Sequence, residues 1–241
     1  MIDIHSHILF SVDDGARSIE ESISILKDLK RAGYSSIILT PHYIKNSKYD
    51  SNREHNLKRL EVLKDEVKKN NLDINLYLGN EIYIDDDIIS LLRDEEITSL
   101  NDSKYLLIEL PMSGEYENYE DIFTDLIYRG YKVILAHPER YFAFQKDFNR
   151  VYELERIGVL FQSNIDSIIG GYGSNAKKMV KRLLKEHKLS FLATDAHRRK
   201  NPDNFLKAHK RALRYIDDEY YQELVEGNAS KLLETKVMET I

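Results

Sequence analysis

Cysteine is absent from the 241-residue sequence. Its absence excludes disulfide bonds, thiolate metal ligands and every mechanism with a cysteine nucleophile. No apolar run approaches the roughly 20 residues that a membrane-spanning helix needs. The first residues, MIDIHSH, have neither the basic start nor the apolar stretch of a signal peptide. We therefore expect no membrane insertion and a cytoplasmic location.

The sequence also lacks an excess of positive charge, because its formal net charge is −6. General nucleic-acid binders present a strongly basic surface, so we expect no nucleic-acid partner. One local basic cluster stands out, and it consists of Lys177, Lys178, Lys181, Arg182 and Lys185. We interpret this cluster as a solvated helix face, and the alternative is a docking surface for an anionic partner.

Short β-like runs alternate with amphipathic helical segments along the chain. Capping boxes at Ser18–Glu21 and Ser51–Glu54 predict two helix starts, and further helices are expected at 119–128, 149–156 and 175–186 and from Pro202 onward. Seven strands are expected, at residues 2–5, 35–40, 74–79, 104–109, 132–136, 159–163 and 189–194. This alternation indicates parallel βαβ units, in a barrel slightly short of eight strands or in an open doubly wound sheet. We predict an α/β fold and one domain over residues 1–241.

Potential metal ligands follow the predicted strands at their carboxyl ends, the edge where parallel α/β folds build their sites. His5 and His7 form an H-x-H pair whose side chains point the same way on an extended strand. Asp195 and His197 repeat that spacing with a carboxylate. The full candidate set is His5, His7, Asp14, His42, Glu81, Glu109, His137, Asp195 and His197.

A set of this size implies two or three divalent ions. Imidazole and carboxylate ligands without thiolate suit Mn, Fe, Zn or Co. Clustered ions lower the pKa of bound water and stabilise phosphoryl oxygens during displacement, so the pattern predicts a phosphoesterase. Arg140, three residues after His137, could hold a phosphate oxygen.

Each candidate has a plainer interpretation when it is taken alone. A single histidine is more often a surface or core residue than a ligand. Asp13-Asp14-Gly15 could be only a turn, where these residue types are at home, and Arg140 could form a salt bridge at the mouth of the barrel. His55, His187 and His209 lie within or at the end of charged helices, and we assign them to solvent.

Taken together, the motifs resemble those of the polymerase and histidinol phosphatase (PHP) superfamily. The matching stretches are IDIHSHILFSVDDG, TPH, GNEIY, LIELP, AHPERY and TDAH. Within the superfamily the sequence is most similar to bacterial manganese-dependent tyrosine phosphatases of capsule and exopolysaccharide operons (the CpsB/YwqE type).

The resemblance implies a distorted (β/α)7 TIM-like barrel with three metal ions, manganese first among the candidates. By that resemblance, one ion is held by His5, His7 and Asp195 and a second by Glu109 and His137, with Glu81 bridging the two. The third is held by Asp14, His42 and His197. An acidic residue at Glu109, in place of histidine, points to the tyrosine-phosphatase branch.

The resemblance also predicts the substrate contacts. Arg140, Asp195 and His197 are the expected catalytic residues, and Arg140 matches the phosphate-contacting arginine of the family. Relatives carry a second arginine about five residues after the last histidine. Here basic residues follow His197 directly, and Arg199 is the predicted second phosphate contact.

The implied activity is hydrolysis of phosphotyrosine in a protein by metal-activated hydroxide, without a phosphoenzyme. The implied substrate is the tyrosine-rich tail of a bacterial tyrosine kinase involved in polysaccharide export. Two alternatives remain open at this point: a phosphoesterase for a small substrate such as histidinol phosphate, and a non-catalytic metal-binding regulatory module.

Overall fold

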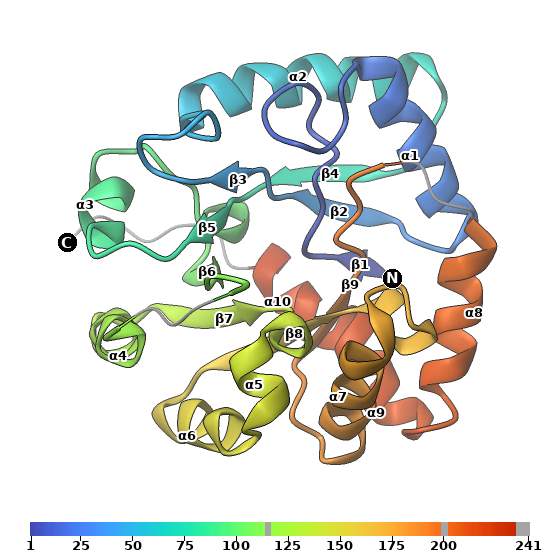
Figure 1. Ribbon diagram of the computed structural model, residues 1–241. Helices are drawn as coiled ribbons and strands as arrows, with labels where there is room; N and C mark the ends of the chain where they lie inside the picture. The colour runs from blue at the N-terminus through green and yellow to red at the C-terminus, as the bar shows by residue number, and fades with distance from the viewer. Residues whose placement is uncertain (114–116, 199–201, 235–241) are drawn as a thin grey trace.

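Short parallel strands lie in the middle of the protein and helices surround them (Figure 1). The computed structural model describes residues 1–113, 117–198 and 202–234. Its strands are β1 (Ile2–Asp3), β2 (Ser36–Leu39), β3 (His42–Tyr43), β4 (Asn75–Leu78), β5 (Glu81–Tyr83), β6 (Tyr105–Glu109), β7 (Lys132–Ala136), β8 (Leu160–Asn164) and β9 (Phe191–Ala193).

The strands pair in two parallel ladders. One ladder has the order β1-β2-β4 and the other β3-β5-β6-β7-β8-β9. β3 follows β2 after two residues, and β5 follows β4 after two residues. β2 and β3 are therefore two segments of one interrupted strand, as are β4 and β5, and the second segment of each pairs in the second ladder. A parallel bridge between Ser6 and Ala196 links the segments that follow β1 and β9. The predicted α/β fold with parallel strands is confirmed, and its distortion takes the form of two ladders.

The helices pack around the strands, and the last three of them follow β9 (Figure 1). They are α1 (Ile19–Arg31), α2 (Arg53–Lys69), α3 (Ile88–Arg93), α4 (Tyr119–Tyr128), α5 (Phe142–Lys146), α6 (Asn149–Ile157), α7 (Gly173–Lys185), α8 (Pro202–Ala212), α9 (Asp218–Gln222) and α10 (Asn228–Glu234). Shorter turns of helix are η1 (Leu100–Asp102), η2 (Pro138–Arg140), η3 (Ile165–Ile169) and the π-helical η4 (Glu223–Gly227). No helix in the described ranges is both long enough and apolar enough to cross a membrane.

The predicted capping box at Ser18 is confirmed in part, and the one at Ser51 is wrong. The Ser18 side chain accepts a hydrogen bond from the backbone N–H of Glu21, whereas the Glu21 carboxylate accepts from the N–H of Arg17. The second helix begins one residue later than predicted, because Asn52 accepts from the N–H of His55. Asparagine caps as well as serine does, and the Ser51 hydroxyl donates instead to Asn56.

Alternate strand residues pack into two hydrophobic clusters, as the two-residue period of a strand requires. On β6, Leu107 belongs to the smaller cluster, and Leu106 and Ile108 belong to the larger one. Glu109 therefore points to the same side as Leu107, but at the carboxyl end of the strand. The smaller cluster thus lies beneath the strand ends that carry the candidate ligands.

His209 is buried, so its predicted assignment to solvent is wrong. Its ring lies between two hydroxyl groups: Nε2 is 3.0 Å from the Tyr34 oxygen and Nδ1 is 2.9 Å from the Tyr221 oxygen. Burial lowers the pKa of His209 to about 4. Sequence reasoning missed it because the charged neighbours on α8 hide an apolar face that also carries Phe205 and Ala212. His55 and His187 are exposed, as predicted.

The loop after β1 folds back onto the residue that it positions. The N–H of Ala16 donates to the carbonyl oxygen of His7, and the N–H of Gly15 donates to the Asp13 carboxylate. A Cβ atom on Gly15 would lie 1.9 Å from the His7 carbonyl oxygen. The loop therefore requires glycine at this position, because no side chain fits between the two backbone segments.

We expect His209→Gln to remove part of the pH dependence of stability. The folded-state pKa of His209 lies below the unfolded value of about 6.5, so its contribution is full above pH 6.5 and is lost as the pH falls toward 4. Between pH 7.5 and 5.5 the wild type should lose about 1 kcal/mol that the variant retains. Urea unfolding at both pH values measures this. A control variant, His55→Gln, should differ from the wild type equally at both, and an equal difference for His209→Gln would refute the linkage.

We expect Gly15→Ala to destabilise the protein by about 1–3 kcal/mol, because the new methyl group overlaps the His7 backbone and the loop must move. The matched control is Gly227→Ala, whose Cβ would lie no closer than 3.7 Å to its neighbours. That variant should be neutral or slightly stabilised. The free energy of unfolding from urea titration compares the two, and equal values would contradict the proposed contact.

Candidate metal centre

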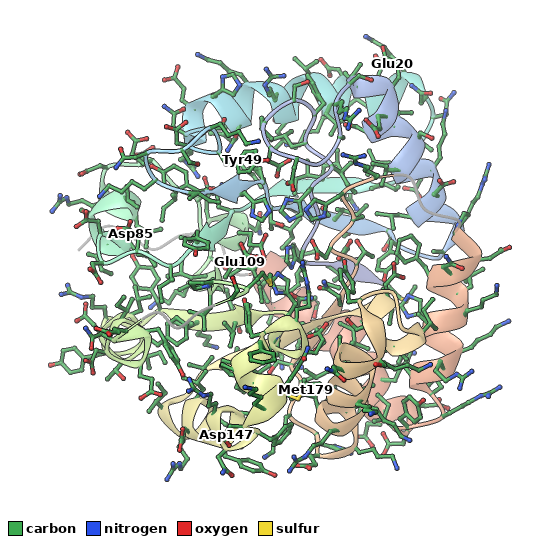
Figure 2. The ribbon with its side chains drawn as sticks, viewed as in Figure 1. Glu20, Tyr49, Asp85, Glu109, Asp147 and Met179 are labelled. Carbon is green, nitrogen blue, oxygen red and sulfur yellow. The ribbon has the colours of Figure 1, made fainter. Side chains whose placement is uncertain are left out.

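The nine predicted ligands gather at the carboxyl ends of the strands. His5, Glu81, His137 and Asp195 are almost fully buried, whereas Asp14 remains exposed. Figure 2 shows Glu109 near the middle of the molecule, at the end of β6. The structure therefore brings together residues separated by up to 192 positions, from His5 to His197.

Glu81 is the carboxylate at the centre of the cluster. Its Oε2 atom lies 3.3 Å from His5 Nε2, 3.1 Å from His7 Nε2 and 2.9 Å from His42 Nδ1. Its Oε1 atom lies 2.9 Å from His137 Nε2. Four imidazoles thus surround one buried carboxylate.

Asp195 is the second buried carboxylate, and its two oxygens face different groups. Oδ1 lies 3.5 Å from His5 Nε2, 3.4 Å from His7 Nε2 and 3.2 Å from His197 Nδ1. Oδ2 lies 3.1 Å from an Arg140 nitrogen. Asp195 therefore connects the histidine cluster with the predicted phosphate-binding arginine.

The remaining two carboxylates lie toward the exposed side. Asp14 Oδ1 is 3.6 Å from His42 Nε2 and 3.5 Å from His197 Nε2. Glu109 is 3.7 Å from His42 and 3.6 Å from His137. These two residues complete a set in which every predicted ligand touches at least one other.

Four overlapping groups in the cluster have potential ligand atoms within 4.8 Å of one another. They are His7, Asp14, His42 and His197; His5, His7 and Glu81; His5, His137 and Asp195; and His42, Glu81 and Glu109. The first contains all three residues predicted for the third ion. Glu81 lies beside both His5 and Glu109, which is consistent with a bridge between the first two ions. The groups differ from the implied sets in placing His137 with His5 and Asp195, and His42 with Glu109.

The donor atoms fit metal ions better than they fit one another. His42 Nδ1, Glu81 Oε2 and Asp195 Oδ1 are buried without a hydrogen-bond partner, although each lies against other ligand atoms. A buried polar atom without a partner costs about 1–3 kcal/mol. Imidazole nitrogens and carboxylate oxygens converging at such distances are the ligand set that divalent transition ions prefer.

The charges of the cluster depend strongly on one another. Burial opposes the ionised form of Glu81, but His5 and His42 outweigh it and hold the pKa of this carboxyl well below its usual range. Burial likewise opposes ionisation of Asp195, yet His5 and His197 lower its pKa. In turn, burial disfavours a charged His5, but Glu81 and Asp195 raise its pKa to about 9.

The pKa values of Glu109 and His137 shift in the opposite direction to those of the two buried carboxylates and of His5. Burial, and then the negative charge of Glu81, raises the pKa of Glu109 to about 8. Burial lowers the pKa of His137 to about 4, despite its contact with Glu81. A neutral His137 has the protonation state that a metal ligand needs.

The backbone is strained at two of the candidate ligands. His137 has φ 33° and ψ 57°, and Asp195 has φ 50°. Non-glycine residues rarely adopt positive φ, and such strain costs about 1–3 kcal/mol and gathers at functional sites. His137 directly follows β7, and Asp195 follows β9 after one residue, so the positive φ angles occur where the chain leaves a strand and its side chain enters the cluster.

A second layer of polar residues orients the candidate ligands, and sequence reasoning missed most of it. Asp13 accepts from His7 Nδ1 at 2.7 Å and from the backbone N–H of His42 at 3.0 Å. Gln162 Oε1 lies 2.9 Å from His5 Nδ1. Such partners fix the ring orientation of metal-binding histidines. The D-D-G motif indicated a possible functional role for Asp13, whereas nothing in the predicted strand that carries Gln162 indicated a role for that residue.

Asn164 and Tyr172 were missed as well. The Asn164 side chain donates to Asp195 Oδ2 at 2.6 Å, and the Tyr172 hydroxyl donates to the same oxygen at 3.2 Å. The Arg140 guanidinium lies over the Tyr172 ring, 4.6 Å from its centre. Tyr172 and Asp195 therefore hold Arg140 from two sides.

The cluster opens into a cavity of about 270 Å³. Asp14, His42, Glu81, Glu109, Arg140, Asp195 and His197 line its polar part. Ile44, Tyr83, Leu110 and Met112 line the rest, so one wall is apolar. Arg199, the predicted second phosphate contact, lies outside the described residues.

The arrangement can bind a phosphate ester, because a cationic guanidinium and a cluster of metal-ligand atoms open into the same cavity. The apolar wall can hold the organic part of such an ester. These features describe a hydrolytic site rather than a structural metal site, since a structural site is closed to solvent.

The fold resembles those of known proteins. A solved structure of YwqE from Bacillus subtilis and CpsB from Streptococcus pneumoniae, described as unique metal-dependent tyrosine phosphatases, matches with a TM-score of 0.91 and 30% identity over 99% of this chain and 96% of that chain. An amidohydrolase from Mycoplasma synoviae, at 15% identity, shares the fold with a TM-score of 0.59.

The sequence has relatives of similar length. The putative tyrosine-protein phosphatase CapC of Staphylococcus aureus is 37% identical over 227 residues, 93% of this chain and 87% of that protein. The tyrosine-protein phosphatase YwqE of Bacillus subtilis is 32% identical over 241 residues, 99% of this chain and 93% of that protein. The family model for capsular polysaccharide synthesis, CpsB/CapC, matches residues 1–234. The chain therefore belongs to the CpsB/CapC family.

Proposed function

We propose that this protein is a metal-dependent phosphotyrosine-protein phosphatase. The observation that carries the proposal is the shared cavity of the His/Asp/Glu cluster, Arg140 and an apolar wall. Membership of the CpsB/CapC family, whose relatives are named tyrosine-protein phosphatases, supports it.

The proposed metal ligands are the nine residues predicted from the sequence: His5, His7, Asp14, His42, Glu81, Glu109, His137, Asp195 and His197. Two or three divalent ions would use them. The imidazole and carboxylate donors suit Mn, Fe, Zn or Co, and we propose Mn²⁺ among these because of the resemblance to manganese-dependent tyrosine phosphatases. Bound ions supply Lewis-acid stabilisation of the phosphoryl oxygens and lower the pKa of water.

Arg140 is the proposed phosphate-binding residue. Its guanidinium pairs with Asp195 and lies over Tyr172, and its side chain is 25% exposed. These contacts leave part of the guanidinium for a phosphate oxygen while fixing its position. A pre-positioned cation of this kind stabilises the charge that develops on a transferred phosphoryl group.

The apolar wall supports an aromatic substrate. Leu110 is buried, and Ile44, Tyr83 and Met112 are half-buried beside it at the mouth of the cavity. A phenyl ring gains free energy by covering such surface. Tyrosine is also a good leaving group, since its phenol has a pKa near 10.

We propose direct hydrolysis without a phosphoenzyme. The sequence has no cysteine, the described residues that line the cavity include no serine or threonine, and the carboxylates and imidazoles that line it are all proposed metal ligands. Arg140, Asp195 and His197 are the proposed catalytic residues, with Asp195 holding the other two through its separate oxygens.

The physiological substrate that we propose is a phosphorylated tyrosine kinase of capsule or exopolysaccharide synthesis, at its tyrosine-rich tail. The family model for capsular polysaccharide synthesis supports this assignment. The single domain over residues 1–241 and the cytoplasmic location remain predictions.

We expect hydrolysis of a tyrosine-phosphorylated peptide to depend on added Mn²⁺ and to stop on treatment with a chelator, because the ligand cluster cannot act without ions. A phosphoserine peptide should react far more slowly, since it offers no ring to the apolar wall. Initial rates of phosphate release measure both. Metal-dependent activity on histidinol phosphate but not on the peptide would overturn the proposed substrate class.

We expect Arg140→Lys to lower kcat/KM by about 10- to 100-fold. The ammonium group of lysine cannot contact phosphate, Asp195 and the Tyr172 ring at the same time, as the planar guanidinium can. The bound metal content should not change. Arg93→Lys, at an exposed arginine of α3 that pairs with Asp94, is the matched control and should leave kinetics unchanged. Wild-type kinetics for Arg140→Lys would exclude the arginine as a phosphate ligand.

A further inference from the structure

A groove of about 300 Å³ lies between α5 and α7, apart from the cavity of the candidate metal centre. Its walls combine aromatic, apolar and basic side chains: Phe142, Lys146, Phe148, Lys178, Met179 and Arg182. Phe142 is 58% exposed, which is unusual for a large apolar ring. Figure 2 labels Met179 between α5 and α7 and Asp147 at the end of α5.

Within residues 1–113, 117–198 and 202–234, two of the three cations in the groove have no acidic partner. Arg182 pairs with Glu186 at 2.7 Å and lies 3.6 Å from the centre of the Phe148 ring. Lys146 is exposed and lies over the Phe142 ring at 4.2 Å, and Lys178 is exposed on α7. Among the described residues neither lysine forms an ion pair with a carboxylate.

The positive charge of this groove contrasts with the rest of the chain. The formal net charge is −6, yet α7 carries Lys177, Lys178, Lys181, Arg182 and Lys185 within 13 residues. The described residues that line the groove include three cations and no carboxylate, and Glu186, which does not line it, pairs with Arg182. The groove therefore presents net positive charge around an exposed aromatic ring.

The two elements that form the groove also adjoin Arg140. Phe142 begins α5 two residues after Arg140, and Tyr172, which lies against the Arg140 guanidinium, immediately precedes α7. α7 also packs against η2, the turn that carries Arg140. Because consecutive Cα atoms are about 3.8 Å apart, Phe142 begins within about 8 Å of Arg140 along the backbone, a span of two or three extended peptide residues.

We propose that the groove between α5 and α7 binds an acidic peptide segment that flanks the phosphotyrosine of the protein substrate. Lys146 and Lys178 would attract carboxylates or a neighbouring phosphate, while Phe142 would pack against an apolar or aromatic side chain of the same segment. The proposal rests on the proposed phosphatase function and adds a determinant of peptide selectivity to it.

The test uses three phosphotyrosine peptides of equal length, in which the positions two to five residues from phosphotyrosine, on both sides, are acidic, neutral or basic. The wild type should have a KM for the acidic peptide about tenfold below that for the neutral one. The double variant Lys146→Glu/Lys178→Glu should lose this preference and favour the basic peptide. Turnover of free phosphotyrosine should stay within twofold of the wild type, because neither lysine lines the cavity of the metal centre.

Phe142→Ala is a second, independent variant. It should raise KM about three- to tenfold for an acidic peptide that also carries a tyrosine in the flank, and leave free phosphotyrosine unaffected. The matched control for charge is Lys207→Glu/Lys210→Glu, which makes the same charge change at exposed positions of α8. That control should retain the wild-type ranking of KM values for the three peptides. It changes the net charge of the protein as the groove variant does, but it leaves the groove itself unchanged.

The outcomes separate the two proposals. A wild type that hydrolyses all three peptides with equal KM, or a control variant that loses the preference as fully as the groove variant, overturns the docking site and leaves the phosphatase function in place. No hydrolysis of any phosphotyrosine substrate overturns the function itself. Loss of binding to phosphatidylglycerol vesicles in the groove variant, with unchanged peptide kinetics, assigns the surface to membranes and also overturns the proposal.

Discussion

Glu81 is a buried carboxylate that lies against four imidazoles, and the arrangement of the site depends on it. An ionised carboxylate without partners is too costly to bury. His5 and His42 compensate for that cost strongly enough to keep the pKa of Glu81 well below its usual range. The same residue follows β4 and begins β5, so the strand register determines where this charge lies. The strand register therefore determines both the position of this buried charge and which candidate metal ligands surround it.

The interruptions between β2 and β3 and between β4 and β5 position Glu81 beside its histidine partner His42. β2 and β4 pair in one ladder, and their continuations β3 and β5 pair in the other, which places His42 directly opposite Glu81. In a continuous strand, residues would alternate strictly between the two faces of the sheet, without the change of ladder between β2 and β3 and between β4 and β5. Sequence patterns did not predict β3 and β5, because segments of two and three residues are too short to show a period.

The sequence predicted what is local or repetitive. β7 and α4 match their predicted bounds, since each is a strongly patterned segment between clear turn residues. The gathering of candidate ligands followed from one rule, that parallel strands end at the same edge. Partners such as Gln162 and Asn164 could not be predicted, because nothing in a buried strand distinguishes an orienting amide from a core residue. His209 was misassigned for a related reason: burial depends on what packs against α8.

Asp195 joins the parts of the site into one unit. One of its oxygens faces His5, His7 and His197, and the other accepts from Arg140, Asn164 and Tyr172. The carboxylate that faces three of the candidate metal ligands thus also positions Arg140, the proposed phosphate-binding residue. Tyr172 lies against the same guanidinium and immediately precedes α7. The candidate metal ligands and the proposed phosphate-binding residue therefore share one carboxylate, and a change in the position of Asp195 is expected to affect both.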